Sequence, residues 1–236
     1  MKRPTRPGGF SLVELLVVIG IIAVLLAVML PVLGAARESA RTTLCQTRAR
    51  AIGTAMVAYL GQSRWTFPAS RHSFSFKNPP RRFWDTALAP FLGEPSLGND
   101  LINDYHTPAW LSLANRAYRC PNDPRTDGSR SYAINVYFEL TRFETPDGRT
   151  WRRLADIPRS ASTVMFGEVD RGESTDHVMA HFWKRYGSLE EVAWGRHRGQ
   201  SNLLYVDGHV VREPREASFD PPRRFDRWDP SGQWLP

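Results

Sequence analysis

Histidines and an aspartate near the end of the sequence are the residues best suited to acid–base or metal chemistry. His181, His197 and His209 can approach Asp207 if the segments that carry them pack together. His177 precedes His181 by four residues, a metal-ligand spacing on a helix, but in a strand two such residues lie about 13 Å apart. A turn accounts for Asp207, and His197 is expected to hold the preceding loop by a hydrogen bond. We therefore favour a structural role over metal binding or catalysis.

An acidic segment is a second candidate site. It contains four carboxylates, on Glu168, Asp170, Glu173 and Asp176. Carboxylate oxygens are the ligands that Ca²⁺ prefers in proteins. A solvated loop explains the same residues without a metal, so calcium binding is the secondary interpretation and no other cofactor is expected.

The two cysteines, Cys45 and Cys120, offer a third kind of chemistry. Outside the cytoplasm such a pair can form a disulfide, which here would tie a helix to a globular domain. Two free buried thiols are the alternative, and the sequence leaves the choice open. A zinc site needs more cysteine or histidine ligands, at closer spacing, than this pair provides.

One carboxylate, that of Glu14, lies at the start of an apolar stretch. The window Leu15–Ala36 has no charged residue, and its 22 residues would form a helix of about 33 Å, enough to cross a bilayer core of about 30 Å. An acid in such a segment costs roughly 2.5–3.5 kcal/mol at mid-bilayer and less near the interface, so its presence indicates a function. Lys2, Arg3 and Arg6 place the N-terminus in the cytoplasm by the positive-inside rule.

A secretory signal peptide is the first alternative for this stretch. Its apolar region would be about 7–15 residues long and would end in a small-residue cleavage site. Here the apolar run is longer, and the plausible processing site, between Gly9 and Phe10, precedes it. The stretch therefore predicts an anchor that stays attached to the mature chain.

Residues 9–14, with the sequence GFSLVE, resemble the class III signal of type IV pilins and type II secretion pseudopilins. The resemblance implies that a prepilin peptidase cuts between Gly9 and Phe10 and that Phe10 is then N-methylated. It also implies that Pro31 is the residue that kinks the helix. Glu14 would pair with the N-terminal amine of a neighbouring subunit, so that two charges unfavourable in the membrane neutralise each other.

A second resemblance is spread over the rest of the chain. His197 is followed by nine residues and then by Asp207 and Gly208, Cys45 lies on the expected helix, and Cys120 opens a Cys-Pro-Asn-Asp turn. These landmarks are similar to those of a large bacterial group of prepilin-like proteins with a C-terminal His-x9-Asp-Gly signature. Major pseudopilins use calcium, so the resemblance adds weight to the acidic segment as a calcium site.

The elements that position these residues are predicted to be one long helix and then a small antiparallel sheet. The helix should run from Phe10 to about Gln62, because apolar residues keep recurring at spacings of three and four. Its buried face beyond the membrane is predicted to carry Leu44, Ala51, Ile52, Ala55, Met56, Tyr59 and Leu60. Residues 63–130 are rich in proline and are predicted to be irregular, with a short helix around Phe83–Leu92.

Strands are predicted over Tyr132–Leu140, Thr163–Val169, His177–Trp183, Asn202–Val206 and His209–Arg212, where β-branched and aromatic residues concentrate. The Asp-Gly pair between the last two predicts a two-residue hairpin. The result is an α+β, pilin-like fold. The expected segments are a cleaved leader (1–9), a transmembrane helix (10–36), its amphipathic extension (37–62), a globular domain (63–213) and an extended or loose tail (214–236).

Charge and motifs narrow the function. The 236 residues carry a formal net charge of +7 but no run of five basic residues, so nucleic-acid binding is not expected. No Gly-rich phosphate loop is present, so any force must come from a separate cytoplasmic ATPase.

We expect a non-enzymatic pilin-like subunit of a type II secretion or type IV pilus-like system. It would be a single-pass protein of the inner membrane with its C-terminal domain in the periplasm. Its partners would be prepilin peptidase, other pilin-like subunits and the inner-membrane secretion platform. The alternative is a tethered extracytoplasmic ligand-binding or metal-dependent enzyme domain that uses the prepilin signal only as an anchor.

Overall fold

The computed structural model describes residues 11–72, 82–95, 97, 107–125, 129–145, 147–170, 176–187 and 191–232. The chain divides into two compact units, Met1–Arg41 and Thr42–Pro236. The N-terminal residues of the first unit, including Gly9 and Phe10, lie outside the described part. Each unit is described by itself below.

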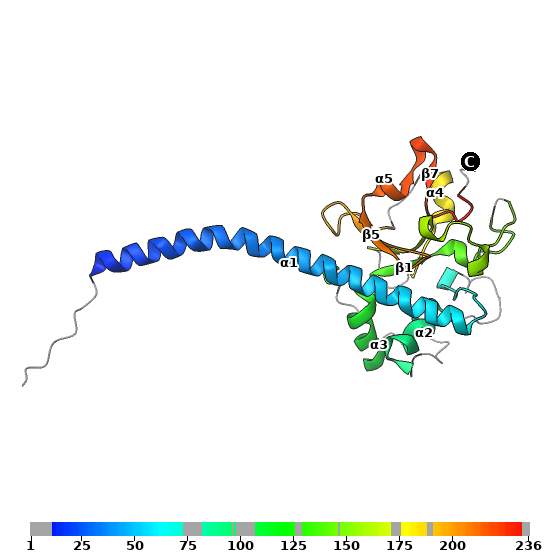
Figure 1. Ribbon diagram of the computed structural model, residues 1–236, viewed down its shortest axis with the longest axis horizontal. Coiled ribbons are helices and arrows are strands. Elements are labelled where there is room, and N and C mark those ends of the chain that lie inside the picture. The colour runs from blue at the N-terminus through cyan, green and yellow to red at the C-terminus, as the bar shows by residue number, and fades with distance from the viewer. Residues whose placement is uncertain are drawn as a thin grey trace, which may run out of the picture. The chain divides into compact units, whose positions relative to one another are not determined.

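The first unit contains the apolar part of helix α1 (Leu12–Gln62), which continues through Pro31 (Figure 1). Its large aliphatic side chains are exposed on every side of the helix, from Leu12 at 76% to Leu33 at 49%. A helix that is apolar all round needs an apolar environment, which is a membrane or other helices. By length and composition α1 is the one helix in the described part of the chain that could cross a membrane.

The second unit begins with the rest of α1, which buries one face. Its buried residues are Thr42, Cys45, Ala49, Ile52, Gly53, Ala55, Met56 and Leu60. The spacing of three and four confirms the predicted amphipathic extension. The predicted face is wrong at Leu44, which is 44% exposed, and at Ala51, which is also exposed, because the stripe passes through Cys45 and Ala49 instead.

A five-stranded sheet packs on this part of α1. Its strands are β1 (Tyr132–Asn135), β2 (Val164–Glu168), β3 (His177–Val178), β4 (Ser201–Tyr205) and β5 (Val210–Glu213), in the order β3-β1-β2-β4-β5. Three pairs are antiparallel, but β1 and β3 run parallel. The α+β class is confirmed, whereas the purely antiparallel sheet is a wrong prediction, because β3 joins the far edge of β1 instead of returning beside β2.

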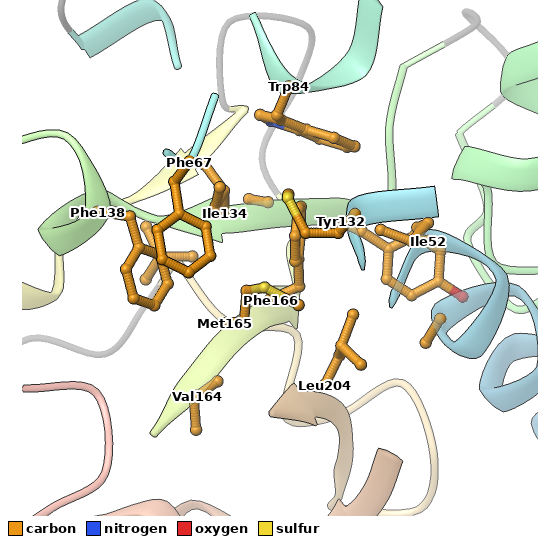
Figure 2. Packing of buried hydrophobic residues seen from close by; sticks show 14 of the residues in the cluster. Ile52, Phe67, Trp84, Tyr132, Ile134, Phe138, Val164, Met165, Phe166 and Leu204 are labelled. Atoms are coloured by element: carbon orange, nitrogen blue, oxygen red, sulfur yellow. The ribbon is translucent and has the colours of Figure 1, made fainter. Parts of the chain in front are cut away.

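The two faces of the sheet are covered by different segments. One face carries Phe166 and Leu204, both labelled in Figure 2 together with Trp84 of helix α2 (Trp84–Leu88). The ring of Phe166 lies 4.9 Å from that of Trp84, and a Cβ at Gly53 of α1 would lie 3.0 Å from Leu204 Cδ1. The opposite face is so closely covered that a Cβ at Gly167 would lie 2.6 Å from a ring carbon of Trp228. The sheet is therefore the middle layer of the unit.

The predicted irregular region contains two helical segments. The predicted short helix around Phe83–Leu92 is confirmed as α2 and the 3₁₀ turn Ala89–Leu92. The prediction did not include α3 (Pro108–Leu113) or the π-helical turn Ala114–Tyr118. Pro108 opens α3 behind the N-cap Thr107, so a residue counted as a helix breaker is here a helix starter.

The strand predicted over His177–Trp183 is also wrong beyond Val178. The chain turns into a 3₁₀ segment, Ala180–Phe182, and the short helix α4 (Trp183–Tyr186). Gly187, with a positive φ of 66°, ends that helix. The turn places Trp183 inside the unit, 2% exposed, where its ring meets that of Trp228 at 4.9 Å.

The C-terminal tail is part of the core, against the prediction that it is extended or loose. It forms α5 (Arg215–Ser218) and the two-stranded sheet of β6 (Phe219–Asp220) and β7 (Phe225–Asp226). Phe219 is 1% exposed and Trp228 is fully buried. Burying these aromatic side chains outweighs the weak local propensity of a Pro/Arg-rich segment.

The Asp-Gly turn joins β4 to β5 as predicted, but the connection is longer than two residues. The last paired residues are Leu204 and Val210, and the Tyr205 amide donates to the His209 carbonyl at 2.9 Å. Gly208 has a φ of 93°, and Asp207 Oδ1 accepts from the His209 amide at 3.1 Å. The turn therefore explains Asp207 and Gly208 without any catalytic role.

Candidate functional sites: the start of the membrane helix and a buried Cys–His–Glu cluster

Glu14 has a local role that the sequence interpretation missed. The Ser11 amide donates to Glu14 Oε2 at 2.8 Å, and the Glu14 amide donates to Ser11 Oγ at 3.1 Å. This reciprocal pair is a capping box, and its Ser-x-x-Glu spacing was visible in the sequence. Both side chains are exposed, so the Glu14 carboxylate in the first turn of α1 is accessible to a partner outside the chain.

The second site lies inside the second unit, where three landmarks of the sequence meet. Cys45 of α1 and Cys120 of the Cys-Pro-Asn-Asp turn form a disulfide across 75 residues of sequence. This is the first of the two alternatives that the sequence left open. His197 and Glu168 lie against the disulfide, and all four residues are fully buried.

The imidazole of His197 contacts four of its neighbours through its two nitrogens. Nε2 lies 3.0 Å from Glu168 Oε1 and 3.5 Å from Cys120 Sγ. Nδ1 lies 3.1 Å from the hydroxyl of Thr42 on α1 and 3.4 Å from the side-chain amide nitrogen of Asn122. His197 therefore binds the helix, the sheet and the disulfide together, which is more than the loop-holding hydrogen bond predicted from the sequence.

The carboxylate of Glu168 is held from both sides. Its second oxygen, Oε2, accepts from the Asn202 amide of β4 at 2.8 Å. Nearby, the Tyr132 hydroxyl donates to the Cys45 carbonyl at 2.8 Å. Burial raises the pKa of Tyr132 well above its usual value, and the charge of Glu168 raises it further, so the phenol stays a donor.

Asp123 holds the turn that carries Cys120 through hydrogen bonds and an ion pair. The Asp123 amide donates to the Cys120 carbonyl at 2.9 Å, and Asp123 Oδ2 accepts from Ser131 Oγ at 2.6 Å. Burial opposes ionisation of Asp123, but hydrogen bonds from Arg125 and the charge of Arg196 lower its pKa. Arg196 directly precedes His197, so this ion pair orders both sides of the cluster.

The structure does not gather the predicted histidines into one site. His209 is partly exposed and stacks on Tyr205, with its ring also bonded to Asp207 at 2.5 Å. His181 instead faces His72, which the sequence did not single out, at a ring distance of 5.8 Å. Burial, followed by the charge of His72, lowers the pKa of His181 to about 4.

The acidic segment does not form one oxygen cage among the residues the structure describes. Asp176 is fully buried and bonds Arg71 and His177, at 2.6 and 2.9 Å. Asp170 pairs with Arg196 at 2.8 Å, and Glu168 belongs to the cluster above. Glu173 lies outside the described residues. Each described carboxylate therefore already has a protein partner.

A cavity of about 480 Å³ opens elsewhere on the second unit. Its lining combines aromatic and charged side chains, among them Tyr137, Trp151, His181, Lys184 and Asp229. Lys184 is bound to Asp229 at 2.5 Å. The cavity has the mixed lining of a small-molecule site, and no sequence pattern indicated it.

These features define a class: a prepilin-like protein with an apolar N-terminal helix and an α+β domain. Residues 5–30 match the prokaryotic N-terminal methylation motif. The chain belongs to the family described as "Protein of unknown function (DUF1559)", which matches residues 34–176. No curated protein and no solved structure matches the chain. The family match ends before His197, so the His-x9-Asp-Gly signature stays a prediction.

Proposed function

We propose that this protein is a non-enzymatic subunit of a type II secretion or type IV pilus-like system. Prepilin peptidase would cut between Gly9 and Phe10, Phe10 would be N-methylated, and the mature chain would assemble through α1 with other pilin-like subunits. The observation that carries this proposal is the first part of α1, which is apolar on every side and carries one acid at its start, within the methylation motif.

The physical argument concerns what replaces lipid when the helix leaves the membrane. Aliphatic side chains exposed all round α1 can be covered equally well by lipid or by the same surface of neighbouring helices. The Glu14 carboxylate then supplies direction, because it can pair with the methylated amine of Phe10 of a neighbour. The inner membrane holds the subunits, with the second unit in the periplasm, and an ATPase and a secretion platform act from the cytoplasmic side.

Substitutions at the capping box separate assembly from helix capping. Glu14→Gln keeps a residue that can close the box but removes the charge, Glu14→Leu removes both, and Ser11→Ala removes the cap but keeps the charge. We expect all three precursors to be cleaved. Both Glu14 variants should lose at least about tenfold in incorporation, which corresponds to about 1.4 kcal/mol, whereas Ser11→Ala should assemble.

The measurement is the share of mature chain in the sheared filament fraction of the native cell. The mature mass and its N-terminal methyl group report processing independently. Normal incorporation of Glu14→Leu would contradict the proposal. Loss in Ser11→Ala but not in Glu14→Gln would show that capping, rather than charge, is what Glu14 contributes.

The cavity favours a second candidate, a ligand-binding domain on a prepilin anchor. Arg185 lines the cavity and is exposed, so Arg185→Ala should leave the fold intact. The full chain in detergent micelles would be screened by thermal unfolding against sugars, amino acids and nucleotides. A ligand-induced rise in Tm that Arg185→Ala abolishes supports this candidate, and no rise with any class removes it.

A further inference from the structure

We propose that Cys45, Cys120, His197 and Glu168 form a zinc site when the two cysteines are reduced. The disulfide and the metal centre are then alternative states of the same four residues. Two cysteines alone are too few for a zinc site, but the fold adds a histidine and a glutamate to them. This inference goes beyond filament assembly and does not depend on it.

The geometry supports four ligands to one ion. One ligand atom from each residue, the two Sγ atoms, His197 Nε2 and a Glu168 oxygen, lies within 4.8 Å of every other. Zinc bonds of 2.0–2.3 Å in a tetrahedron place ligand atoms roughly 3.3–3.8 Å apart. The contacts from His197 Nε2 to Glu168 Oε1 and to Cys120 Sγ, 3.0 and 3.5 Å, are already close to that spacing.

The groups hydrogen-bonded to His197 and Glu168 are placed as the neighbours of zinc ligands must be. A histidine that binds a metal through Nε2 must carry its proton on Nδ1 and donate it to a neighbour. Two groups lie at Nδ1, the Thr42 hydroxyl at 3.1 Å and the Asn122 side-chain amide nitrogen at 3.4 Å, and in the metal-bound state the nearer Thr42 hydroxyl accepts that proton. Glu168 keeps one oxygen on the Asn202 amide while the other faces the metal position. The hydrogen-bonding partners that orient His197 and Glu168 are therefore in place without the metal.

Charge and burial explain why a cation suits the reduced state. Two thiolates and the carboxylate would place three negative charges among residues that are fully buried. Uncompensated charge in such a place is costly, and Zn²⁺ removes two of the three charges while binding the thiolates directly. The binding would clamp α1 at Cys45 to the sheet, as the disulfide does.

The change of state needs a two-electron reductant, either a dithiol or a phosphine. The S–S bond breaks, and two electrons and two protons convert the cysteines to thiols. A dithiol reductant supplies both and becomes a disulfide. A phosphine supplies the electrons and becomes a phosphine oxide, with the oxygen and the protons coming from water. Zinc binding then displaces the two thiol protons, and the imidazole binds as its Nδ1–H tautomer. A small-molecule disulfide reverses the step by thiol–disulfide exchange: it takes up the two electrons and becomes two thiols, the Cys45–Cys120 bond re-forms, and the metal is released.

Cobalt(II) is the spectroscopic probe for this proposal, used on the full chain in detergent micelles. After anaerobic reduction with a phosphine, we expect one equivalent of cobalt to give a thiolate-to-cobalt charge-transfer band and intense tetrahedral visible bands. Zinc should displace it, and the oxidised chain should give neither band. His197→Gln and Glu168→Gln should weaken binding at least about tenfold. His209→Gln, a change at a histidine outside the cluster, is the matched control.

Several outcomes overturn the proposal. These are a reduced wild-type chain without the charge-transfer band, weak bands of octahedral cobalt only, or undiminished binding in both cluster variants. If those variants fail to fold, the wild-type protein decides the question. Zinc should raise the Tm of the reduced chain and leave that of the oxidised chain unchanged, and an unchanged Tm in the reduced chain counts against the site.

Discussion

The two parts of α1 are built from similar aliphatic residues but differ in where their partners lie. Leu16 and Val24 of the first unit are 57% and 66% exposed, whereas Ile52 and Met56 of the second are fully buried. The second part packs on a sheet of its own chain and is tied to it by a disulfide. The aliphatic side chains of the first part are exposed, so under the proposed function they are covered by lipid or by neighbouring helices, while the second part is a structural core.

The two acidic residues Glu14 and Glu168 also differ in exposure and in where their partners lie. Glu14 is exposed and is hydrogen-bonded to Ser11, three residues before it. Glu168 is fully buried between His197 and the Asn202 amide. An exposed acid can exchange its partner when a neighbouring subunit arrives, but a buried one cannot do so without unfolding or a change in the cluster itself.

The largest expected effect is a loss of stability when a buried side chain of the second unit is removed. Trp228→Ala removes a fully buried ring that packs on Gly167 and Trp183. We expect the free energy of unfolding to fall by about 3–5 kcal/mol, because the cavity cannot collapse fully. Urea unfolding of the full chain in micelles, followed by circular dichroism, measures it.

The matched control for this change is Leu25→Ala in the first unit. Leu25 is 58% exposed, so its truncation should alter the same free energy by less than about 0.5 kcal/mol. If both substitutions destabilise the domain equally, the distinction between the two parts of the helix is wrong.

A charge in the first part of α1 is expected to have the next largest effect. Leu25→Arg places a cation near the middle of the apolar window, which should cost about 2.5–3.5 kcal/mol of insertion free energy. The readout is the fraction of the chain that stays in membranes after alkaline extraction.

Val57→Arg is the control, since Val57 lies on the exposed side of α1 in the second unit and is 54% exposed. It should leave both insertion and folding unchanged. Equal retention of the two arginine variants would argue that the first part of α1 does not lie in the bilayer.

The smallest expected effect is a pH dependence within the second unit. The pKa of His181 falls from 6.5 to about 4 in the folded chain, mainly because the ring is buried. Between these pH values the unfolded chain binds a proton that the folded chain does not. Stability should therefore rise from pH 4 to 6.5, by about 1–2 kcal/mol allowing for solvent screening of the partly exposed ring.

His181→Gln should remove this rise, which unfolding curves across the pH range would show as a difference between the two proteins. The comparison is needed because Asp226, whose pKa burial raises to about 6, contributes a slope of opposite sign. That contribution is common to both proteins and cancels in the difference. A wild-type slope that His181→Gln leaves unchanged would mean that another group titrates.

Local patterns were sufficient for the elements that carry a strong periodic signal. The apolar run and the three-to-four spacing predicted α1 to its last residue, Gln62, and β-branched residues predicted the position of β2 and β4. The pattern failed where packing overrides propensity. Pro108 opens a helix, β3 ends after two residues, and the Pro/Arg-rich tail supplies Trp228 to the core.

The sequence by itself determined the membrane helix, its single acid, the methylation motif and the α+β class, because each is written in neighbouring residues or in a short period. The capping box of Ser11 and Glu14 is also local and was overlooked. Only the tertiary structure decided that Cys45, Cys120, Glu168 and His197 meet, since they lie on separate elements up to 152 residues apart and no local spacing encodes their contact. Their meeting depends on the order of strands in the sheet, which is set by the burial of aromatic and aliphatic side chains across the whole domain.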